Sequence, residues 1–170
     1  MTDLAVVDTN VPLVAHGAAP EAPAACVEAC IAEIEEFHQD RKRLVLDDGW
    51  FIISEYLKKL PTAGPVGLGR GFLKWVLTNQ LNPARCVLVT ITPLDRAAEN
   101  FEDCKDFEEF PHRPELAAFD PPDRKFVAVA NAHPEHPRIS QALDSKWWGW
   151  RAALAFCVCG VFFFVRGLQK

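Results

Sequence analysis

Four acidic residues occupy positions from which they could hold a metal ion together. Asp8 and Asp144 each follow a short apolar run that is typical of a buried strand. In an open α/β sheet, ligands bind just outside the carboxyl ends of the strands, so both side chains are placed for chemistry. Asp123 stands where a helix begins, and Glu55 lies on the polar side of another helix. If the two strands are neighbours, we expect the four carboxylates to meet at one edge of the sheet.

The chemistry of such a set follows from its charge. Carboxylates brought together repel one another, and their pKa values rise unless a cation compensates. Oxygen ligands without histidine or cysteine suit Mg²⁺ or Mn²⁺ rather than zinc. Such an ion lowers the pKa of a bound water and clamps a phosphodiester for attack. The pattern therefore predicts a metal-dependent nuclease, with Asp8, Glu55, Asp123 and Asp144 as catalytic residues and metal ligands.

Each of these acids also has a simpler explanation. Asp8 and Asp144 could only cap the helices that follow them. Asp123 could simply be a favourable negative charge at a helix N-terminus. Glu55 could pair with a lysine one helical turn away, at 58 or 59. We favour the metal-site interpretation because all four acids fall where a common site requires them.

Strands and helices alternate along the chain, which favours an α/β sandwich around a parallel sheet of about five strands. The glycine-rich stretch 64–71 is expected to be a loop. Trp147, Trp148 and Trp150 could stack on bases, but their helical spacing means that some must belong to the core, and the core is the favoured interpretation. The expected strands cover 4–7, 44–46, 86–91, 139–143 and 161–165. The expected helices cover 12–17, 24–39, 50–60, 72–81, 95–104, 123–130 and 146–158.

The length and composition of the chain suit one globular domain. The chain has 170 residues, of which 49% are hydrophobic and 24% charged. A net charge of -5 argues against a protein that coats nucleic acid over its whole surface, although it allows a nuclease whose acidic site binds cations. The six cysteines show no zinc or redox spacing and suit the cytoplasm. No apolar run reaches the roughly 20 residues of a spanning helix, so no membrane partner is expected.

The residues around the four acids carry a resemblance to a known family. Val6-Val7-Asp8-Thr9-Asn10 looks like the opening motif of PIN domains, which include the VapC-type toxin ribonucleases. Ser54-Glu55, the segment that begins with Asp123, and Leu143-Asp144-Ser145 are similar to the second, third and fourth acidic positions of that family. The resemblance extends over nearly the whole chain, so residues 1–170 are expected to form a single PIN-like domain.

The resemblance implies a three-layer sandwich with strand order 3-2-1-4-5 and a Mg²⁺- or Mn²⁺-dependent endoribonuclease. It further implies RNA as the substrate, and it raises an antitoxin protein and a homodimer as partners. Thr9, Asn10, Ser145 and Lys146 are expected to support the acids or contact the substrate. Lys146 departs from the pattern, because many members have an acid there; its amine could contact phosphate or partly neutralise the site.

Two other functions stay open at this point. A PIN-like module without catalytic activity, which binds RNA or a protein, would suit Lys146 and the acidic net charge. A phosphoryl-transfer enzyme of the haloacid dehalogenase type also begins with an aspartate after its first strand. That family carries Asp-x-Asp, however, and the second position here is Asn10.

Overall fold

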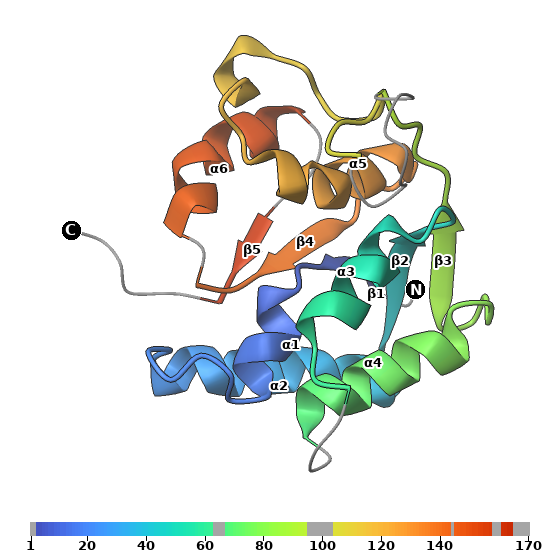
Figure 1. Ribbon diagram of the computed structural model, residues 1–170, viewed down its shortest axis with the longest axis vertical. Helices are drawn as coiled ribbons and strands as arrows, with labels where there is room; N and C mark the ends of the chain where they lie inside the picture. The colour runs from blue at the N-terminus through green and yellow to red at the C-terminus, as the bar shows by residue number, and fades with distance from the viewer. Residues whose placement is uncertain (1–2, 63–66, 95–103, 144, 158–160, 165–170) are drawn as a thin grey trace.

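The computed structural model describes residues 3–62, 67–94, 104–143, 145–157 and 161–164. Within these ranges, helices alternate with the strands of one parallel sheet, so the predicted α/β class is confirmed (Figure 1). The strands are β1 (Asp3–Val7), β2 (Lys42–Asp47), β3 (Cys86–Val89), β4 (Arg138–Gln141) and β5 (Val161–Phe163). The helices are α1 (Asn10–Ala15), α2 (Ala24–His38), α3 (Phe51–Lys59), α4 (Leu68–Asn79), α5 (Arg124–Ala132) and α6 (Ser145–Cys157), with the 3-10 turns η2 (Pro114–Leu116) and η3 (Pro121–Asp123).

The sheet has the order β3-β2-β1-β4-β5, which puts β1 between two parallel neighbours. Ala5 is in register with Leu44 of β2, and Val6 with Ile139 of β4. These side chains are fully buried, because helices cover both faces of a parallel sheet. The strands all run the same way, so their carboxyl ends share one edge, and the residue that follows β1 lies in the middle of it.

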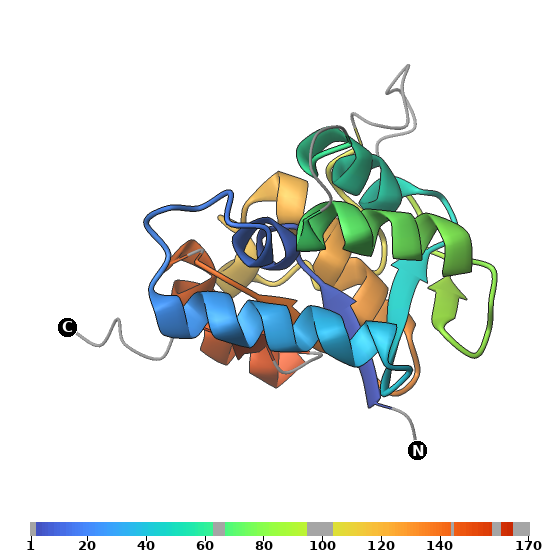
Figure 2. The same cartoon turned by 90° about the horizontal axis from the view of Figure 1, so that it is seen from below.

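Helices form a layer on each face of the sheet. Figures 1 and 2 show α1, α2 and α4 on one side of the strands and α5 and α6 on the other. Under the first layer, Phe37 packs between Phe72 and Trp75, with ring centroids 6.1 and 5.9 Å away. On the other face, the ring of Trp147 meets that of Phe119 at 4.9 Å. Trp147 is almost fully buried and Trp150 packs against the core, as expected, whereas Trp148 is 38% exposed.

Helix α4 begins earlier than the sequence pattern predicts. The expected loop covered 64–71, but the helix starts at Leu68 and includes two of the glycines. A Cβ atom on Gly69 would lie 2.9 Å from the Pro12 carbonyl oxygen and 2.9 Å from Cβ of His16. Gly69 therefore allows α4 to approach α1 closely, and packing outweighs the low helix propensity of glycine.

The helix expected over 95–104 lies outside the described residues except at its last position. Among the helices that the structure describes, none is both long enough and apolar enough to cross a bilayer.

Candidate functional site

Asp8 lies immediately after the central strand, at the carboxyl edge of the sheet. Its backbone N–H donates to the Ser140 carbonyl oxygen of β4 at 2.9 Å, which fixes it between two strands. Only 3% of the residue is exposed. The N–H of Asn10, the first residue of α1, donates to Oδ1 at 2.9 Å, although Thr9 and not Asp8 is the N-cap of that helix. Oδ2 has no hydrogen-bond partner within the described part of the chain, and this oxygen is available to a ligand.

Glu55 reaches the same edge because two sets of hydrogen bonds hold helix α3 against the ends of β2 and β1. The Asp47 carboxylate at the end of β2 accepts hydrogen bonds from Phe51 N at 2.7 Å and Ile52 N at 2.9 Å, which fixes the start of α3. The next contact is made by Tyr56, whose buried hydroxyl donates to the Val7 carbonyl oxygen. This bond ties α3 to the last residue of β1. Glu55 is therefore brought beside Asp8.

Two lysines and one hydroxyl group surround the Glu55 carboxylate. Thr9 Oγ1 donates to Oε1 at 2.7 Å, and Lys59 Nζ lies 2.8 Å from the same oxygen. Lys125 of α5 forms a salt bridge with Oε2. Burial raises the pKa of Glu55, but the charge and hydrogen bond of Lys125 and the bonds from Lys59 and Thr9 outweigh it. The net pKa lies below its usual value, so Glu55 is ionised at neutral pH.

Asp123 is positioned by the layer that covers the opposite face. It is the last residue of η3 and directly precedes α5, and its Oδ2 accepts a hydrogen bond from Trp147 Nε1 at 3.0 Å. Burial raises its pKa, and the charge of Glu55 raises it further against the opposing effect of Trp147. Oδ1 has no hydrogen-bond partner among the residues that the structure describes. Asp123 thus offers a second available carboxylate oxygen.

The three acids are close enough to affect one another electrostatically. Burial raises the pKa of Asp8 to about 8, and the negative charge of Asp123 and then that of Glu55 add to the effect, while the Asn10 N–H opposes it. Thus Asp8 and Asp123 both have raised pKa values, whereas Glu55 is neutralised by lysines. The lysines therefore do not fully offset the cost of ionising Asp8 and Asp123.

The remaining predicted site residues belong to the segment after β4. Asp144 lies outside the described residues, and so does the side chain of Ser145, the first residue of α6. Lys146 is exposed, and its Nζ lies 3.5 Å from Asp120 Oδ2. Lys146 is therefore in contact with an acid three residues before Asp123. The structure brings together Asp8, Thr9, Asn10, Glu55 and Asp123 from the predicted set.

The donor set fits a divalent cation through two of its acids. Asp8 and Asp123 offer hard carboxylate oxygens that lack partners in the described chain, and a cation would relieve their raised pKa values. Glu55 differs, because Lys59 and Lys125 already occupy both its oxygens. In the described ranges, no group of three or more Asp, Glu, His or Cys side chains is arranged to hold a metal. The fit therefore rests on Asp8 and Asp123.

Sequence reasoning missed the residues that position and neutralise these acids. Lys125, only two residues after Asp123, was not assigned a role, although a cation so close to a predicted acid is a visible signal. The hydroxyl contact of Tyr56 with β1 depends on tertiary packing, and no pattern in the sequence indicates it. Comparison with protein-family models, with curated proteins and with solved structures gave no match to this chain.

Proposed function

We propose that this chain is a metal-dependent endoribonuclease of PIN type that hydrolyses RNA phosphodiesters with Mg²⁺ or Mn²⁺. The observation that supports this most is the convergence of Asp8, Glu55 and Asp123 at the edge where β1 ends, where two of the three keep raised pKa values despite the nearby lysines. The strand order β3-β2-β1-β4-β5 is also the order that the resemblance to PIN domains implies. The position at the carboxyl edge of the sheet, the three acids and the strand order therefore all support a metal-dependent nuclease.

In this proposal Asp8 and Asp123 hold the cation. A bound divalent ion lowers the pKa of water and neutralises phosphate charge, which is the chemistry that phosphodiester hydrolysis needs. The Asn10 N–H fixes the orientation of the Asp8 carboxylate through Oδ1 and leaves Oδ2 for the ligand. Glu55 stays ionised between its lysines. The side chain of Lys59 is 51% exposed, so its ammonium can also donate to a phosphate oxygen of the substrate.

The test is cleavage of a labelled single-stranded RNA by the full chain with Mg²⁺ or Mn²⁺. Asp8→Asn should abolish cleavage because it removes a metal ligand, and Asp48→Asn is the matched control, since Asp48 is an exposed acid at the end of β2. Binding of Mn²⁺ is measured in parallel. A protein that neither cleaves RNA nor binds either ion would contradict the proposal.

A second candidate is a PIN-like module without catalytic activity, which binds RNA or a protein. One observation favours it: Lys59 and Lys125 already neutralise Glu55, so part of the site is balanced without a metal. The same variants separate the two functions. In a binding module, Asp8→Asn would leave RNA or partner binding largely intact. The antitoxin partner and the homodimer remain predictions.

A further inference from the structure

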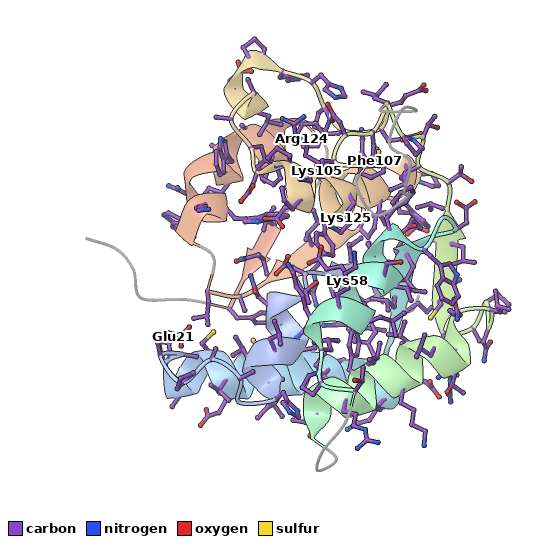
Figure 3. The ribbon with its side chains drawn as sticks, in the orientation of Figure 1. Glu21, Lys58, Lys105, Phe107, Arg124 and Lys125 are labelled. Carbon is purple, nitrogen blue, oxygen red and sulfur yellow. The ribbon has the colours of Figure 1, made fainter. Side chains whose placement is uncertain are left out.

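A pocket beside the acids is lined by several lysines. It has a volume of about 180 Å³, and four lysines line it: Lys58, Lys59, Lys105 and Lys125. They come from α3, from α5 and from the segment before η2; Figure 3 labels three of them on one side of the molecule. Among the described residues of the lining, Glu55 is the only acid, and Lys59 and Lys125 form ion pairs with it.

The pocket is connected to the candidate active site through shared residues. Glu55 and Lys125 belong to the lining, and both also belong to the cluster that contains Asp8 and Asp123. A ligand that fills the pocket therefore lies next to the acids. Typical pockets for whole small molecules have volumes of roughly 300–1,000 Å³. This smaller one suits a phosphate with part of its sugar, as a segment of a longer strand would present.

Trp50 adds an aromatic surface at the edge of the same pocket. It is 46% exposed although it is a tryptophan, and it lines the pocket with Ser54. Its φ of 67° lies in the left-handed region, which is unfavourable for a bulky side chain. The chain thus holds a large ring at the surface, beside a basic pocket, in a costly conformation. Lysines with an adjacent exposed ring are the combination that binds single-stranded nucleic acid.

We propose that this pocket binds a phosphate of a single-stranded RNA next to the phosphodiester at the acids, with Trp50 stacking on a neighbouring base. The inference rests on the proposed function for its substrate class. It assigns the positioning of the strand to Lys58, Lys105 and Trp50, none of which is among the acids that would hold the metal.

The test measures binding of a fluorescently labelled 12-nucleotide uridine strand in EDTA, so that no cleavage occurs. The double variant Lys58→Gln/Lys105→Gln should bind several-fold more weakly and lower the slope of log affinity against log salt by about 0.7 to 1.4. The matched control is Arg41→Gln/Lys74→Gln, which removes two exposed charges away from the pocket. An equal loss in the control would overturn the assignment.

Trp50 is tested by one substitution that removes the aromatic ring and one that keeps it. Trp50→Gly relieves the left-handed backbone and keeps the fold, yet should weaken binding roughly 5- to 100-fold because stacking is lost. Trp50→Phe should retain most of the affinity. Uridine monophosphate is the second probe. If it bound as tightly as the strand and independently of Trp50, the pocket would serve a small phosphorylated molecule, and the RNA assignment would be wrong.

The outcome for the pocket is independent of the outcome for catalysis. Binding that depends on the two lysines and Trp50, without cleavage when Mn²⁺ is added, would support the pocket and contradict the nuclease. Cleavage with unchanged binding in every pocket variant would support the nuclease and overturn the pocket.

Discussion

Asp8→Asn should make the metal-free protein more stable at neutral pH, although the same change should abolish cleavage. Burial and the neighbouring charges raise the pKa of Asp8 from 3.8 to about 8. Between these two values the folded state holds a proton that the unfolded state has released. The free energy of unfolding therefore falls as the pH rises through this range. The cost is about 1.4 kcal/mol per pH unit, or about 4 kcal/mol at pH 7.

Asparagine avoids that cost because it does not titrate, and its side-chain carbonyl can still accept the hydrogen bond from Asn10 N. The stability gained by Asp8→Asn should thus grow by about 3 kcal/mol between pH 5 and pH 7. Taking the difference between variant and parent largely removes the contributions of other titrating groups. This gain is a large share of the roughly 5–15 kcal/mol that stabilises a typical domain.

The assay is urea unfolding of both proteins in EDTA at pH 5, 6, 7 and 8, with Asp48→Asn as the exposed control. Addition of Mn²⁺ at pH 8 should stabilise the parent and leave Asp8→Asn nearly unchanged, because the ligand is gone. An Asp8→Asn protein that is less stable than the parent at pH 8, or a difference that does not vary with pH, would refute the electrostatic reasoning. Asp8 would then be a structural hydrogen-bond acceptor whose charge the fold tolerates.

Three further outcomes follow from the site and the sheet. Trp147→Phe removes the donor to Asp123 Oδ2 and should cost about 2 kcal/mol of unfolding free energy at pH 8, measured in urea, while raising the pKa of Asp123 further. The dissociation constant for Mn²⁺, measured by calorimetry, should fall as the pH rises from 6 to 8, by roughly tenfold per unit, because Asp8 must lose its proton before it binds a cation. The buried Ser140 hydroxyl of β4 donates at 2.7 Å to Oε1 of Glu33 in α2, an acid outside the candidate site. Ser140→Ala removes this donor and should cost about 1–3 kcal/mol of unfolding free energy, yet leave the cleavage rate per folded molecule unchanged. A loss of activity would show that this hydrogen bond affects the site.

The sequence predicts most of the scaffold because its signals are local. The apolar run before Asp8 and the helical spacing around Glu55 are each contained within a few residues, and both elements are found where expected. The start of α4 could not be predicted in the same way. Gly69 is helical because α1 lies against it, and nothing within its own segment indicates that neighbour.

The same distinction applies to the candidate site. Residue types and order were enough to predict that Asp8, Glu55 and Asp123 share an edge, because parallel strands have their carboxyl ends together. The state of each carboxylate depends instead on contacts between elements. Trp147 reaches Asp123 from α6, and Lys125 reaches Glu55 from α5. Such contacts have no periodic signature in the sequence.

The two lysines on Glu55 separate the three acids into two functional groups. Glu55 is neutralised by Lys59 and Lys125 within the chain, and both lysines also line the basic pocket. Asp8 and Asp123 are buried with raised pKa values, and a cation is the partner that would lower them. In the proposed nuclease, Asp8 and Asp123 would hold the metal, while the ammonium groups beside Glu55 would contact a phosphate of the substrate. The proposed reaction therefore needs both kinds of charge at this one edge of the sheet.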